Sequence, residues 1–129
     1  MSIHYLTESE LLMLNQTLCR QQQQLFAIVK PAVLNEAIQR PQVCIDGYEP
    51  FPEIWEKAAV VMDTLLKEKP FLHANLLTGA LAADLMLRLN GIEIHSQKED
   101  IELIKSVALQ QVTVLQIAEW LRHRAGSRV

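Results

Sequence analysis

Apolar residues recur at helical spacing through most of the chain, and polar capping residues mark where several of these runs begin. The first run of leucines follows a capping box formed by Thr7 and Glu10. This pattern predicts a first helix over residues 8–24, and the glutamine run 21–24 is expected to be its solvated last turn.

Two further helices are predicted before the middle of the chain. Pro31 suits a first helical turn and Pro41 stops a helix, so residues 31–39 are expected to form a short one. A second amphipathic run, over residues 53–67, presents one apolar face made of Ile54, Ala58, Val61, Met62 and Leu65.

Residues 75–90 are almost entirely apolar, and Gly91 supplies a helix stop directly after them. A helix that is apolar all round belongs in the centre of a bundle, so this segment is predicted to be the most buried element. Asp84 and Arg88 stand four positions apart and share one face, which favours a structural ion pair over a functional one.

Two helices are predicted in the last third of the chain. Ser96 and Glu99 form a capping box that opens a helix over residues 96–109, with Ile101, Ile104 and Ala108 facing inward. Thr113 and Gln116 open the last helix in the same way. Its inner stripe is expected to consist of Val114, Ile117, Ala118 and Leu121.

Strand content is expected to be close to zero. Residues 42–52 contain Asp46-Gly47 and two prolines, which predict an extended or hairpin-like flap. Residues 92–94 are the other strand candidate. The pattern therefore predicts an all-α bundle of five or six helices, with residues 1–129 as a single domain and a short extended flap.

Composition limits the classes of function. The chain has 129 residues, half of them hydrophobic, and a net charge of −3, which argues against a nucleic-acid binder. No apolar run is long enough to span a membrane. Two cysteines without CxxC spacing, and no signal peptide, favour a cytoplasmic protein with free thiols. The one basic cluster is expected to follow the last helix as its C-terminal cap: Arg122, His123, Arg124 and Arg128.

One segment carries a resemblance to a known family. Residues 69–78 read Lys-Pro-Phe-Leu-His-Ala-Asn-Leu-Leu-Thr and resemble the Fic/Doc motif H-x-F-x-[D/E]-[G/A]-N-x-R-T. The next helix, ending in Arg-Leu-Asn-Gly at 88–91, is similar to that family's R-x-N-G helix. Residues 34–42 resemble its L-x-x-A-x-x-R-P-Q segment, and 56–59 its E-K-A-A helix start. The resemblance implies a Fic/Doc-type helical bundle of the short Doc-like branch.

In active members of that family the leading His is the general base, the acidic residue holds Mg²⁺ and the Arg clamps phosphate. The resemblance places Lys69 at the position of the base and His73 at that of the metal ligand. Leu77 stands at the position of the Arg, and Leu76 at the neighbouring position, which is often Lys. A protonated amine is a poor base, nitrogen is a poor ligand for magnesium, and leucine cannot bind phosphate.

Three other motif positions, Phe71, Asn75 and Thr78, match the family and are assigned to packing and loop geometry. The backbone around Ala74, Asn75 and Leu76 opens a helix and is expected to bind an anion weakly. The sequence therefore predicts a catalytically degenerate protein with no metal site and no cofactor.

Three hypotheses follow for the function. The first is an inactive member that binds a protein partner, such as a small antitoxin-like or regulatory protein, in a groove beside the flap. The second is an active Doc-like kinase or nucleotidyltransferase (an AMPylator) that uses ATP and Mg²⁺ on a protein hydroxyl. It would need Lys69 or His73 as its base. The third is a homodimer module in which exposed leucines meet across a two-fold axis.

Overall fold

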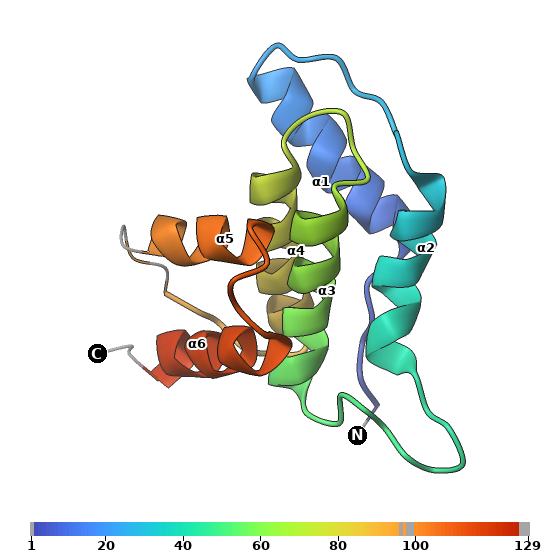
Figure 1. The fold of residues 1–129 in the computed structure, drawn as a ribbon, viewed down its shortest axis with the longest axis vertical. Helices are drawn as coiled ribbons and strands as arrows, with labels where there is room; N and C mark the ends of the chain where they lie inside the picture. The colour runs from blue at the N-terminus through green and yellow to red at the C-terminus, as the bar shows by residue number, and fades with distance from the viewer. Residues whose placement is uncertain (1, 96, 98–99, 127–129) are drawn as a thin grey trace.

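The computed structural model describes residues 2–95, 97 and 100–126, which form six α-helices and one short 3-10 helix, η1 (Figure 1). Within these residues there is no strand, and residues 92–94 are irregular, so the prediction of an all-α fold is confirmed. The elements in chain order are α1 (Glu8–Gln21), α2 (Pro31–Gln39), η1 (Arg40–Gln42), α3 (Ile54–Glu68), α4 (Asn75–Leu89), α5 (Asp100–Ala108) and α6 (Val114–Gly126).

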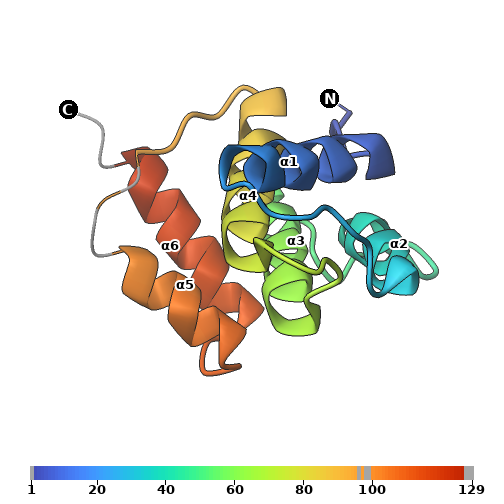
Figure 2. The same ribbon diagram turned by 90° about the horizontal axis from the view of Figure 1, so that it is seen from above.

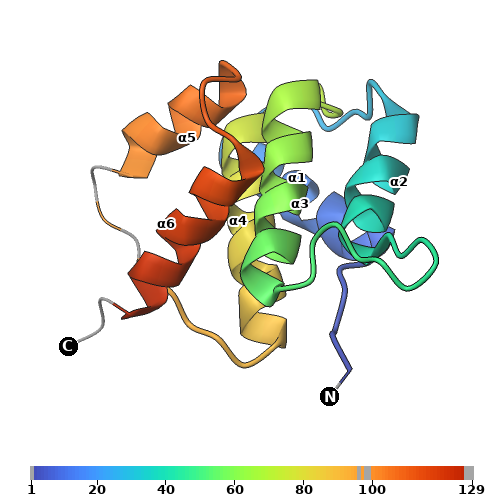
Figure 3. The ribbon, with the colours of Figure 1, turned by 60° about the horizontal axis from the view of Figure 1, so that its bottom comes forward.

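The helices are arranged around the pair α3 and α4. Helix α2 lies on one side of this pair, and α5 and α6 lie on the other (Figures 2 and 3). Helix α1 packs across α4 and also contacts α2. The core is therefore built where α3 meets its neighbours.

Helix α3 is the most buried element. The prediction that residues 75–90 form the most buried element is therefore wrong. Every residue from Lys57 to Leu66 is buried, because α3 contacts α2, α4, α5 and α6. Helix α4 instead leaves Leu77 and Leu81 exposed by 42% and 38%. Its composition suggested burial all round, but no element in the described part of the chain covers the outer side that carries these two leucines.

Helices α3 and α4 approach each other closely at Gly79. A β-carbon at this position would overlap Cδ1 of Leu66 and would lie 3.3 Å from its Cγ. Because Leu66 is fully buried in a closely packed core, moving its side chain aside would disturb its neighbours. The glycine is therefore required by the packing of the two helices.

The first helix ends at Gln21, three residues before its predicted end. Gln23 adopts a left-handed conformation with φ of 57°, and the backbone N–H of Gln24 donates to the carbonyl of Cys19 over 2.8 Å. This hydrogen bond closes the helix with a left-handed cap. The glutamines are exposed, so no apolar contact holds a further helical turn.

The predicted start of the fifth helix, at Ser96 and Glu99, lies outside the described residues. Helix α5 begins at Asp100, and its fully buried residue is Val107. Ile101, which was expected to face inward, is exposed. The exposed face of this short helix is broader than the spacing of its isoleucines suggested.

The basic residues expected after the last helix lie inside it, so that prediction is corrected. Helix α6 continues to Gly126, and Arg122 bonds to Glu53 at the start of α3. Arg124 bonds to Asp100 of α5, which makes it a structural partner and not a terminal cap. Arg128 lies outside the described residues.

The flap, residues 42–52, is hairpin-like as predicted, although Gln42 belongs to η1. An isolated antiparallel bridge joins Ile45 and Tyr48 around the turn Asp46-Gly47. The flap precedes α3, whereas the loop of residues 69–74 follows it, so the 15 residues of α3 separate the two by about 22 Å (Figure 1). The first hypothesis assumed that the flap lies beside this loop, whereas the two lie at opposite ends of α3.

Two other predictions can be compared with the structure. Cys19 is buried and Cys44 is exposed, and both are free thiols, as expected. No helix in the described ranges is both long enough and apolar enough to cross a bilayer.

Candidate functional site

The motif loop, residues 69–74, turns the chain from α3 into α4. Lys69 ends α3 with φ of 50°, and Ala74 precedes α4 with φ of 63°. Both residues lie in the left-handed region, which costs a residue with a β-carbon about 1–2 kcal/mol. The loop holds this conformation at both ends because neighbouring side chains fix its backbone.

Asn75 provides the most local of these contacts. Its side-chain amide donates to the carbonyl of Phe71 over 2.8 Å, and its side-chain oxygen accepts from the backbone N–H of Phe71 over 3.0 Å. The Phe71 ring is 2% exposed and packs against the ring of Phe26. The hydroxyl of Thr78 donates to the carbonyl of Ala74 over 2.7 Å. All three residues that match the family motif thus make structural contacts.

Asn15 of α1 also holds the motif loop, and it was not predicted from the sequence. Its side-chain amide donates to the carbonyl of His73 over 2.8 Å and to the hydroxyl of Thr78 over 3.0 Å. The thiol of Cys19 donates to its side-chain oxygen over 3.4 Å. The available signal was a polar residue four positions after Leu11, on the inner face of the helix.

Residues 27–30 form the extended segment that lies beside the motif loop. The backbone N–H groups of Val29 and Lys30 donate to the carbonyl of Pro70 over 2.7 and 3.0 Å. The N–H of Leu72 donates to the carbonyl of Ala27 over 3.0 Å. These bonds make the segment, rather than the flap, the neighbour of the site.

The motif cavity, of about 380 Å³, lies against the start of α4 and is lined by Lys69, Ala74, Asn75, Leu76, Leu77 and Ala108. The structure therefore brings together five of the eight motif positions singled out from the sequence. His73, Phe71 and Thr78 do not line it. Leu76 and Leu77 line the cavity with apolar side chains. The exposed Lys69 is the cation among its described lining residues.

Backbone N–H groups at the start of α4 are available at this cavity. The first backbone hydrogen bond of the helix runs from the N–H of Thr78 to the carbonyl of Ala74, over 3.0 Å. The N–H groups of Asn75, Leu76 and Leu77 therefore precede the helical ladder, and no side chain caps them. They carry the partial positive charge of a helix N-terminus.

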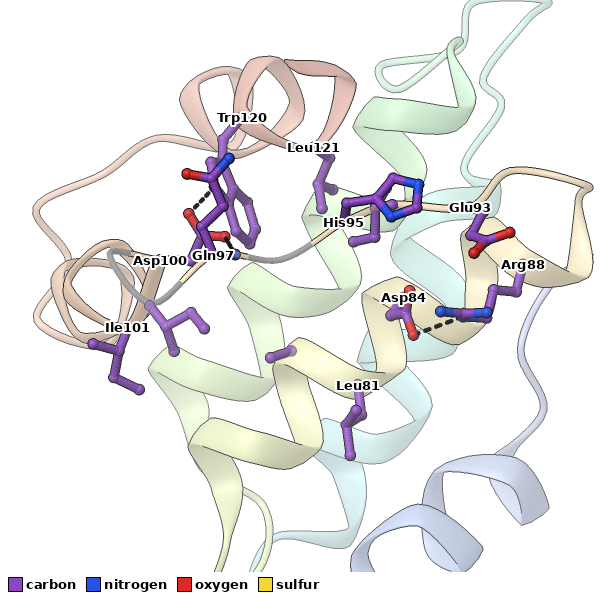
Figure 4. Close-up of a pocket in the computed structure, with 13 residues that line it drawn as sticks. Leu81, Asp84, Arg88, Glu93, His95, Gln97, Asp100, Ile101, Trp120 and Leu121 are labelled. Carbon is purple, nitrogen blue, oxygen red and sulfur yellow. Dashed lines mark hydrogen bonds and ion pairs between the residues drawn. The ribbon is translucent and has the colours of Figure 1, made fainter. Parts of the chain in front are cut away.

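A second cavity, of about 600 Å³, lies between α4, α5 and α6 (Figure 4). Asp84 and Arg88 form an ion pair on its wall over 2.9 Å, which confirms the structural pair expected from the sequence. This cavity touches no residue of the motif loop. We therefore assign the candidate site to the smaller motif cavity, where the family motif lies.

Asp100 on the wall of the second cavity is a structural carboxylate. Burial alone would raise its pKa, but hydrogen bonds from Arg124, the backbone N–H of Gln97 and Trp120 outweigh burial and lower the pKa. The Trp120 indole donates over 2.9 Å (Figure 4), and Arg124 donates through Nε and Nη2. These bonds tie α5 to α6.

Metal-ligating side chains do not converge anywhere in the described ranges. Within residues 2–95, 97 and 100–126, no three His, Cys, Asp or Glu side chains are placed to hold one ion.

Comparison with known proteins gives two matches. The model of the Fic/DOC family matches residues 5–87, which include α1 to α3, the motif loop and most of α4. A stretch of 62 residues is 31% identical to Toxin Doc of Mycolicibacterium smegmatis and covers 48% of each chain. The match thus spans about half of the length of that relative.

Proposed function

Because this chain belongs to the Fic/DOC family, we propose that it is a catalytically degenerate member that acts by binding a protein partner. The observation that carries the proposal is the wall of the motif cavity. Leu76 and Leu77 stand there, at the positions where the family resemblance implies the charged phosphate donors. Hydrocarbon side chains cannot make the charge-assisted hydrogen bonds that hold a phosphate group.

Lys69 supports the same proposal from the position of the general base. Its side chain is exposed and borders the motif cavity. The ammonium group of lysine offers hydrogen-bond donors and no acceptor. It therefore cannot accept a proton from a substrate hydroxyl, which is the step that a base at this position performs.

Magnesium does not fit the residues around the cavity. No carboxylate belongs to the described residues that line it, and His73, at the position of the metal ligand, is half-buried and does not line it. Mg²⁺ requires oxygen ligands in near-octahedral geometry. A magnesium nucleotide therefore does not fit the described residues that line this cavity.

A weak anion site is the feature that remains. The N–H groups at Ala74, Asn75 and Leu76 lie at or just before the first turn of α4, with the Lys69 ammonium on the same cavity. Backbone donors and the helix dipole attract an anion. Without an arginine or a metal ion, they do not make a cellular nucleotide site.

The partner is proposed to be a small antitoxin-like or regulatory protein. The matched relative is named Toxin Doc, which favours a toxin-antitoxin context. Exposed apolar side chains lie on the segments around the motif cavity, at Val29, Leu72 and Leu77. We place the docking surface there, beside residues 27–30, because the flap lies at the other end of α3.

The proposal predicts that the lost chemistry can be rebuilt on the loop. A five-fold variant restores the constellation that the resemblance implies, through Lys69→His, His73→Asp, Ala74→Gly, Leu76→Lys and Leu77→Arg. It is expected to gain magnesium-dependent ATP binding, measured by titration calorimetry. The chain should tolerate Leu77→Arg well, because Leu77 is 42% exposed. It should also tolerate Ala74→Gly, because glycine relieves the left-handed conformation at position 74.

The single variant Leu77→Arg is the matched control and should gain nothing. A phosphate clamp alone leaves the metal and the base missing, and such groups act as a unit. Circular dichroism verifies that each variant is folded. If the folded five-fold variant gains no magnesium-dependent binding, the motif loop is not a vacated nucleotide site.

A further inference from the structure

Lys57, near the start of α3, is a buried cation with no role in the motif site. Its side chain is 2% exposed, and it is the first buried residue of the helix. Taking an ammonium group out of water costs several kcal/mol unless it is paired and hydrogen-bonded. The groups that it bonds therefore identify which parts of the chain it holds in place.

All three partners of the Lys57 ammonium lie outside α3. It donates to the carbonyl of Pro41 over 2.9 Å and to Oε1 of Glu49 over 3.2 Å. It also lies 5.4 Å from the centre of the Tyr5 ring, a cation–π distance. One buried charge thus joins the N-terminal segment, the middle residue of η1 and the second arm of the flap.

Arg40 contacts the same arm of the flap at Phe51. Its guanidinium lies 5.7 Å from the centre of the Phe51 ring. The guanidinium is fixed by α3, since Nη1 donates to Asp63 over 3.3 Å and to the hydroxyl of Thr64 over 2.8 Å. The flap arm is therefore held between two cations that are themselves anchored on the core.

The tip of the flap is closed by its own backbone. The N–H of Ile45 donates to the carbonyl of Tyr48 over 2.8 Å, and the N–H of Tyr48 returns a bond to Ile45 over 2.9 Å. Both side chains are exposed, by 63% and 68%, so the tip gains little from packing. Its orientation relative to the core depends on the anchored arm.

We propose that Lys57 is a positioning residue that locks the flap in one conformation, with the ion pair to Glu49 as the lock. The lock fixes the orientation of the flap, which carries the exposed Ile45 and Tyr48 and lies at the end of α3 opposite the motif loop (Figure 1). When the ion pair opens, the flap becomes free to move relative to the core.

The test measures backbone ¹⁵N order parameters for residues 43–51 in the full chain. In the unmodified protein they should be near those of rigid backbone, about 0.85, and in Glu49→Gln they should fall below about 0.6. Asp46→Asn is the matched control, because it removes the same charge from the same flap without touching Lys57. It should leave the order parameters unchanged.

Lys57→Met separates positioning from simple structural support. Methionine fills a similar volume without a buried charge, and the Glu49 side chain left behind is 45% exposed, so the thermal midpoint should be largely retained while the flap loses order. A flap that stays rigid in both Glu49→Gln and Lys57→Met would overturn the proposal, as would a flap already disordered in the unmodified chain. If Lys57→Met fails to fold, the comparison of Glu49→Gln with Asp46→Asn decides.

Discussion

At the scale of single residues, the ionisation of Asp100 contributes to the stability of the contact between α5 and α6. Its carboxylate is buried and accepts bonds from Arg124 and Trp120, and these bonds hold its pKa below the ordinary value of 3.8. A lowered folded-state pKa means that the folded state favours the charged form. The stabilisation is therefore present above about pH 3.8 and is lost as the pH falls through the folded-state pKa.

Asp100→Asn should consequently destabilise the protein in a pH-dependent way. At pH 7 we expect a loss of about 3 kcal/mol in the free energy of unfolding, because the change leaves Arg124 without the carboxylate. The loss should shrink as the pH falls below about 3.8. Urea unfolding between pH 3 and pH 7 measures the loss of stability at pH 7 and its decrease at lower pH.

The control for this prediction is Glu102→Gln, which removes an exposed carboxylate from the same helix. It should change stability by less than about 0.5 kcal/mol at either pH. An Asp100→Asn deficit that is constant from pH 3 to pH 7 would contradict the role given to its ionisation.

At the scale of elements, the contact between α3 and α4 depends on Gly79. Gly79→Ala should lower the free energy of unfolding by about 1–3 kcal/mol, because the added methyl group overlaps the buried side chain of Leu66. The same change in an open helix would be favourable by about 1 kcal/mol. Thermal or urea denaturation measures the difference.

A double-mutant cycle with Leu66→Ala identifies the cause. Leu66→Ala alone leaves a cavity and is destabilising, but it removes the atoms that the new methyl group would meet. Gly79→Ala should therefore cost less, or become favourable, in that background. Equal costs in both backgrounds would show that the overlap with Leu66 is not the reason.

The helices themselves could be predicted from local signals, whereas their burial could not. The capping boxes at Thr7 and Thr113 are both formed, because each depends on residues three positions apart. The ranking of α3 above α4 in burial depends on which helices pack around each. That is a long-range property, and the apolar composition of α4 gave the wrong indication.

The surroundings of the motif loop show the same limit. The motif loop and its eight positions could be located from the sequence. The flap, however, was expected to be the extended segment that lies beside the loop. The true neighbour, residues 27–30, carries no turn signal of the strength of Asp46-Gly47. Asn15 was missed because a single polar residue on an inner helix face does not reveal which loop it bonds.

At the scale of the whole molecule, the family match and the motif cavity lead to different expectations. The chain belongs to the Fic/DOC family, whose model matches residues 5–87, and the motif of active members implies nucleotide chemistry in those members. The cavity is lined by Leu76, Leu77 and the Lys69 ammonium, with no carboxylate among its described lining residues. We propose that the scaffold was kept for binding a protein while the chemistry was lost.

The most direct test of this claim is titration calorimetry of the unmodified protein with ATP, with and without Mg²⁺. We expect no binding at low micromolar ligand and no effect of magnesium, because the described residues that line the cavity include neither a metal ligand nor a phosphate clamp. A dissociation constant in the low micromolar range that depends on magnesium would contradict it and would support an active transferase.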